Sequence, residues 1–134
     1  MIVALRIFFA FVLASMLVVT GWASMQVPLW AIPRAVGGHP WFLATLADTY
    51  WGFFTFYLWL AYKETSRSAR ALWLLAIVLL GNIAMAAYGL AVTLRTPVTA
   101  PVEDILRRGL PVSPALPTAL LAGFGLVTAA AALR

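Results

Sequence analysis

The stretch that decides the fold class is Ile7–Ala23, IFFAFVLASMLVVTGWA, which contains no charged residue and directly follows Arg6. A helix needs about 20 apolar residues to cross a hydrocarbon core about 30 Å thick, and this run approaches that length. The run lacks the alternating pattern of a membrane barrel strand. A helix is therefore the only structure that would satisfy its backbone in lipid.

Three further windows are long apolar runs, and the last of them is Ala-rich and less apolar. The chain is thus predicted to be an all-α polytopic membrane helical bundle, a single membrane domain over residues 1–134. We expect three core transmembrane helices and a fourth, at 7–23, 41–62, 71–94 and 115–133. The alternative for 115–133 is a surface hairpin or a helix docked on a partner.

The composition excludes several other classes of protein. Of 134 residues, 64% are hydrophobic and only 10% are charged, and the mean hydropathy is +0.99. Soluble domains are nearer half apolar and a quarter charged, so neither a water-soluble fold nor disorder fits. The absence of Cys excludes a disulfide scaffold, thiol catalysis and Cys-ligated zinc.

The segments around the windows carry further signals. The first window resembles a signal peptide, with a basic residue and a small-residue site near Ala23, but we expect it to be retained as a span. The stretch 101–108 has Pro at its start, acidic residues early and two Arg late. It is predicted to be a short amphipathic interfacial helix, with an ordinary capped loop helix as the alternative.

The basic residues lie at the ends of the windows, where anionic headgroups can satisfy them, so no nucleic acid is expected. The turn 63–70 is the densest positive cluster, and we place it in the cytoplasm with both termini. The expected location is an inner (cytoplasmic) or photosynthetic membrane. The residues expected at the membrane interface are Trp41, Trp59, Lys63, Arg67 and Arg70.

Asp48 is the most informative polar residue, because a carboxylate inside a membrane is costly. Ala44, Asp48 and Gly52 share one helix face, so Asp48 is predicted to point into the bundle, where Asn82 or Tyr88 would donate to it. The interpretations are a packing hydrogen bond, which we favour, and a proton relay or ligand anchor. The predicted helix-packing and polar residues are Asp48, Gly52, Gly81, Asn82 and Tyr88.

The second window is rich in aromatic residues, which pack on neighbouring helices and lipid or on flat ligands. The candidate ligands are carotenoid, (bacterio)chlorophyll, quinone or structural lipid. The only histidine, His39, precedes this window; it is either an axial ligand to a chlorophyll magnesium or a loop histidine. The candidate pigment or lipid contacts are His39, Trp51, Phe54 and Tyr57. No metal site and no catalytic set is apparent, so an enzyme is not expected.

Several motifs, PWxxATLxDxY from Pro40, WxAYKExS from Trp59 and GN at Gly81, resemble a family of small integral membrane proteins. The family is known as domain of unknown function 1475, and the resemblance covers residues 1–110. It implies a three-span core and occurrence in plants, cyanobacteria and other bacteria. It draws attention to Asp48 and to Lys63-Glu64, and it implies no activity.

These observations favour a non-enzymatic accessory subunit of a larger membrane complex, photosynthetic or respiratory. Such a subunit would fill gaps between larger membrane subunits and hold lipid or pigment. The alternative is a small proton-coupled carrier that uses Asp48. A membrane enzyme acting on lipid or quinone is a third interpretation, for which the sequence offers no reaction centre.

Overall fold

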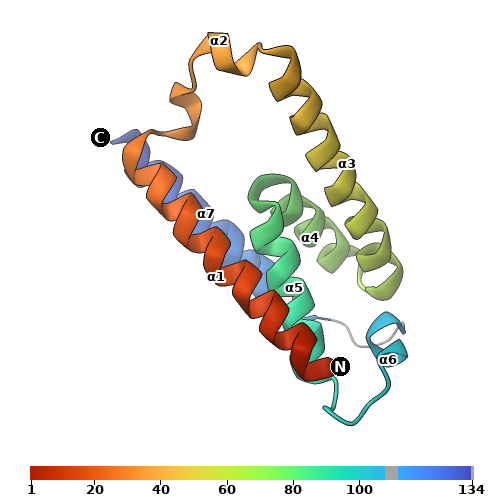
Figure 1. Cartoon of the computed structure of the whole chain (residues 1–134). Coiled ribbons are helices and arrows are strands. Elements are labelled where there is room, and N and C mark those ends of the chain that lie inside the picture. The colour runs from red at the N-terminus through yellow and green to blue at the C-terminus, as the bar shows by residue number, and fades with distance from the viewer. Residues whose placement is uncertain (108–111, 134) are drawn as a thin grey trace.

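The computed structural model describes residues 1–107 and 112–133, and in those residues every regular element is a helix (Figure 1). The all-helical prediction is therefore confirmed. The helices are α1 (Ile2–Gln26), η1 (Leu29–Ala31), α2 (Arg34–Gly37), α3 (Pro40–Lys63), α4 (Arg67–Leu80), α5 (Asn82–Arg95), α6 (Glu103–Leu106) and α7 (Ala115–Ala132).

The most extensive helix pair is α1 with α5, two helices far apart in the sequence. Gly89 lets them approach closely, because a Cβ there would lie 2.5 Å from the ring of Phe9. Arg6 donates to the carbonyls of Thr93 (3.1 Å) and Thr96 (2.8 Å) at the C-terminal end of α5. A cation placed there satisfies carbonyls that lack helical partners and complements the helix dipole.

The predicted span 71–94 is not one rod, because it breaks at Gly81 into α4 and α5. Gly81 has φ +53° and ψ −124°, a conformation open to glycine and strained for other residues. The ring of Phe53 packs where a Cβ would lie, at 2.6 Å. Each half has 14 residues, so each is about 21 Å long and too short to cross a hydrocarbon core.

Two described helices, α1 and α7, are long and apolar enough to cross a membrane, with mean hydropathies of 2.6 and 1.7. The prediction of three core spans is wrong on this criterion. The third predicted span is divided into α4 and α5. The helix α3 is long enough to span, but Asp48 and many Trp and Tyr residues lower its mean hydropathy. The Ala-rich segment at 115–133, by contrast, contains one of the two qualifying helices.

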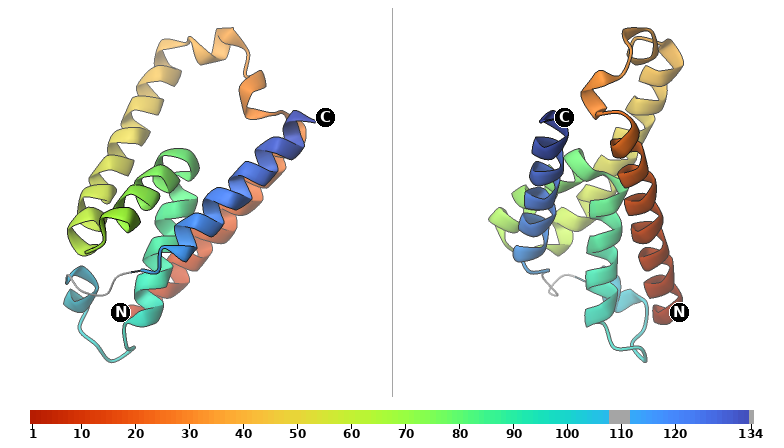
Figure 2. Two further views of the ribbon diagram at one scale, coloured as in Figure 1. Left: turned by 180° about the vertical axis from the view of Figure 1, so that it is seen from behind. Right: turned by 90° about the vertical axis from the view of Figure 1, so that its left-hand side faces the viewer.

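The core lies at one end of the molecule. Trp73 and Tyr88 are fully buried in its centre. In the long helices α1 and α3, the buried residues lie at one end: Ile2 in α1, and Leu60 and Lys63 in α3. At the opposite end α3 diverges from α1, and η1 and α2 bridge the gap (Figure 1). Seen from the side, α1 and α7 run in the same direction with α5 between them (Figure 2).

The predicted interfacial helix at 101–108 is reduced to the four residues of α6. Asp104 forms an ion pair with Arg107 at 3.3 Å, and residue 108 lies outside the described residues. Ile105 is buried, because this segment folds back onto the corner between α3 and α4.

Candidate functional site

A buried polar cluster lies at the corner between α3 and α4. Glu64 is fully buried, and its Oε1 accepts from the Tyr88 hydroxyl (3.0 Å) and from the Val112 amide (2.9 Å). Its main-chain carbonyl accepts two bonds from the Arg70 guanidinium, at 2.9 and 2.6 Å. One carboxylate thus ties α5 and the start of α7 to this corner.

Lys63, the neighbour of Glu64, is also fully buried. Its Nζ donates to the carbonyls of Ile105 (2.5 Å) and Arg107 (3.0 Å). Burial lowers the pKa of Lys63, and the charge of Glu64 opposes that shift in part. Buried charges need such partners, and these two hydrogen bonds hold α6 and Arg107 against Lys63.

Three aromatic rings enclose Tyr88. Phe56, Trp59 and Trp73 meet its ring edge-to-face, with centroids 6.2, 5.7 and 5.0 Å away. In the described part of the chain, three buried polar atoms have no partner: the Nε1 atoms of Trp59 and Trp73 and Oε2 of Glu64. The Tyr88 hydroxyl donates to Glu64 and is sealed from solvent, so the cluster joins α5 to the corner between α3 and α4.

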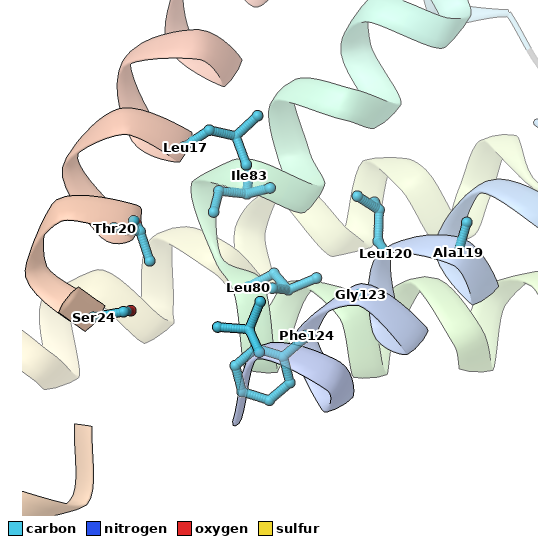
Figure 3. A pocket seen from close by; sticks show the side chains of 11 residues that line it. Leu17, Thr20, Ser24, Leu80, Ile83, Ala119, Leu120, Gly123 and Phe124 are labelled. Atoms are coloured by element: carbon cyan, nitrogen blue, oxygen red, sulfur yellow. The ribbon is translucent and has the colours of Figure 1, made fainter. Parts of the chain in front are cut away.

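Two adjoining cavities, of about 330 and 460 Å³, lie at the end of the molecule where α3 diverges from α1. Figure 3 shows the smaller one, with Leu17, Thr20 and Ser24 on α1, Leu80 and Ile83 at the Gly81 break, and Leu120 and Phe124 on α7. The larger one extends past Trp30 and Asn82 toward Tyr50 and Phe53 on α3. Both volumes lie in the range of ligand sites, about 300–1,000 Å³.

The predicted position of Asp48 inside the bundle is wrong. Its side chain is exposed on α3, and among the described residues it has no hydrogen-bond or ionic partner. Tyr88 bonds Glu64 instead, and Asn82 is exposed at the start of α5. The prediction assumed that 71–94 runs antiparallel to α3 as one rod, and the break at Gly81 removes that register.

The four candidate pigment contacts do not form one site. His39 is exposed at the N-cap of α3, where its amide donates to the Val36 carbonyl. Trp51 is 72% exposed and Phe54 39%, on the outer side of α3. Tyr57 turns inward, and its hydroxyl donates to a carbonyl of α4 at 3.3 Å.

The residues expected at the membrane interface divide into two groups. Trp41 and Arg67 are exposed. Trp59, Lys63 and Arg70 turn toward the polar cluster instead.

Of the two predicted packing glycines, Gly81 makes a close contact with Phe53. Gly52 is exposed, and a Cβ there would meet nothing within 4 Å.

The sequence interpretation missed the structural role of Glu64, the capping role of Arg6 and the cavity hydroxyls of Thr20 and Ser24. Glu64 lies in the polar stretch KETSRSAR, which is typical of an exposed turn. Arg6 lies at a predicted membrane boundary, where lipid headgroups explain a cation equally well. The one signal for Glu64 was its place in the motif WxAYKExS.

Comparisons with known proteins give one match. No solved structure and no curated protein matches the chain. The family model described as "Protein of unknown function (DUF1475)" matches residues 1–109, which include α1 through α6 and end before α7. The chain therefore belongs to the DUF1475 family.

Proposed function

We propose that this protein is a non-catalytic accessory subunit of a larger membrane assembly, and that an exposed stripe of α3 contacts a neighbouring subunit. Given the organisms that the family resemblance implies, a photosynthetic or respiratory complex is the host that we expect. One observation carries the proposal: α3 exposes large aromatic residues together with a carboxylate that has no partner among the residues that the structure describes.

The α3 stripe consists of Trp41, Asp48, Trp51, Leu58 and Tyr62, which recur at helical spacing on one face. The four apolar or aromatic members are 77, 72, 71 and 63% exposed, in chain order. Trp and Tyr are enriched at protein interfaces and among the residues that dominate binding energy. The composition of the stripe therefore favours a protein partner over lipid tails.

The exposed face of α1 differs from the α3 stripe. Phe11, Val18, Trp22 and Met25 are 71, 70, 61 and 68% exposed, and no charged residue follows Arg6 in this helix. Such a face is satisfied by hydrocarbon alone. The α1 face thus suits lipid, and it provides matched control positions for the α3 stripe.

Asp48 gives the stripe a specific requirement. A carboxylate that becomes buried when the stripe docks is costly unless another group donates to it or neutralises it. Its exposed position favours contact with a second subunit over a proton relay within this bundle. A partner helix that offers a hydroxyl, amide or cationic group at this depth would satisfy it.

The test compares Trp51→Ala with Trp22→Ala in native membranes solubilised in mild detergent. We expect wild type and Trp22→Ala to migrate with larger chains on native gels. Truncating a central interface Trp removes about 2 kcal/mol or more, about 30-fold in affinity, so Trp51→Ala should migrate mainly as free protein. Wild-type protein that runs only as a free monomer in gentle detergent would contradict the proposal.

A further inference from the structure

The two cavities between α1 and α7 leave open space beside two glycines. Gly21 on α1 and Gly123 on α7 both line the smaller cavity. A Cβ at either position would meet nothing within 4 Å. Both glycines are exposed, so larger side chains fit at these positions without disturbing the backbone.

The lining of the cavities is uncharged. Neither lining includes Asp, Glu, Lys, Arg or His, and most of the lining residues are aliphatic, aromatic or glycine. A phosphate or carboxylate placed here would find no cation to pair with. A charged headgroup is therefore disfavoured on electrostatic grounds.

Five hydroxyls line the cavities, and those of Thr49, Tyr50 and Thr128 already donate to main-chain carbonyls. Thr20 and Ser24 line both cavities from one face of α1, and neither hydroxyl has a hydrogen-bond partner among the described residues. On α3, by contrast, Thr45, Thr49 and Thr55 each donate to the carbonyl four residues before. Side-chain hydroxyls in helices commonly make that bond. The two α1 hydroxyls are left available, beside the Asn82 amide that also lines the larger cavity.

We propose that these cavities bind one uncharged lipid with a long apolar chain and a small oxygen-bearing head. The chain would lie against Leu17, Leu120 and Phe124, and the head would accept from, or donate to, Thr20 and Ser24. An isoprenoid alcohol or quinone and a diacylglycerol share this chemistry. The α3 residues that line the larger cavity, Leu46, Thr49, Tyr50 and Phe53, are not members of the α3 stripe, so the site is separate from the proposed docking face.

Glycine substitutions give a matched pair of variants. Gly123→Phe places a ring in the smaller cavity, whereas Gly125→Phe places the same ring on α7 at a position that lines neither cavity. A Cβ meets nothing within 4 Å at either position, so both variants are expected to fold. Far-UV circular dichroism and thermal unfolding verify this before binding is compared.

The measurement is native mass spectrometry of the full chain, purified from its membranes in mild detergent, with extraction and identification of bound lipid. We expect wild type and Gly125→Phe to retain one uncharged lipid per chain and Gly123→Phe to lose at least fivefold in occupancy. The double variant Thr20→Val/Ser24→Ala should lose about 30-fold in affinity, because it removes two neutral hydrogen bonds of about 1 kcal/mol each. The mass identifies an acyl or a prenyl lipid, and an ultraviolet spectrum that changes on reduction identifies a quinone.

Delipidated protein provides the second arm, with a C20 prenyl alcohol, diacylglycerol and phosphatidylglycerol added separately as probes. Saturable binding of either uncharged probe, weakened by Gly123→Phe, supports the proposal. Binding of phosphatidylglycerol alone, equal occupancy in both Phe variants, or cavities closed by a second copy without lipid would overturn it. Migration with larger chains on native gels is measured for the same variants and should not change. A failure of the lipid proposal would therefore leave the docking proposal standing.

Discussion

Replacing Glu64 with Ala should destabilise the protein more than any other single truncation in the polar cluster. The variant leaves the Tyr88 hydroxyl and the Val112 amide without an acceptor in a fully buried site. An orphaned buried donor costs about 1–3 kcal/mol, so the two together predict a loss of about 3–4 kcal/mol in the free energy of unfolding. Glu64→Gln keeps one oxygen in place and should lose about 1 kcal/mol, since hydrogen bonds to a charged group are the stronger ones.

The assay is equilibrium unfolding of the purified chain in mixed micelles, followed by near-UV circular dichroism. A double-mutant cycle with Tyr88→Phe isolates the hydrogen bond between the two side chains, for which we expect a coupling energy of about 1–2 kcal/mol. Hydrogen exchange at the Val112 amide gives a local readout and should accelerate in Glu64→Ala. A loss below about 0.5 kcal/mol, with Val112 still protected, would refute the reasoning, because surface substitutions commonly have effects of that size.

Three further predictions concern the positions that shape the fold. Gly81→Ala should destabilise the fold by about 2 kcal/mol or more, because a Cβ at φ +53° would lie 2.6 Å from Phe53. The control Gly52→Ala, at an exposed helical position, should stabilise the fold by about 0.5–1 kcal/mol. Equal shifts in melting temperature for the two variants would contradict this. Arg6→Met removes two hydrogen bonds to the C-terminal end of α5 and should lower the free energy of unfolding by about 1–2 kcal/mol in chemical denaturation. An unchanged denaturation midpoint would show that the cap is dispensable. Burial lowers the pKa of Lys63 below its ordinary 10.5, so the unfolded chain retains this proton at pH values where the folded chain has lost it. The unfolding free energy should therefore gain a contribution that rises with pH toward 10.5, and Lys63→Met, which cannot titrate, should lose that slope.

The sequence predicted the fold where local signals suffice. A long uncharged apolar run identifies α1, and the dense polar stretch after Tyr62 marks the end of α3. The break at Gly81 was not predictable in the same way, because a glycine inside an apolar run is equally consistent with close packing in an unbroken helix. Its positive φ depends on the ring of Phe53, which lies 28 positions earlier in the chain.

The candidate sites were less predictable because they depend on contacts between distant segments. Lys63 and Glu64 belong to a stretch that looks solvent-exposed, and they are buried where Ile105, Arg107 and Val112 bond to them. Asp48 stands out in the sequence as the one carboxylate inside the four apolar windows, but the sequence does not reveal which side of α3 faces the bundle. The unbonded hydroxyls of Thr20 and Ser24 leave no signal in the sequence.

The most direct test of the central claim, that α3 meets a partner subunit, uses the absence of cysteine from the natural chain. Leu58→Cys on the α3 stripe and Val18→Cys on α1 place single thiols at positions that are 71 and 70% exposed. Each is labelled in native membranes with a photoactivatable thiol crosslinker. The account predicts that position 58 forms a discrete adduct with a larger membrane protein while position 18 yields mainly lipid adducts. Equal patterns from the two positions, or lipid adducts alone from position 58, would contradict it.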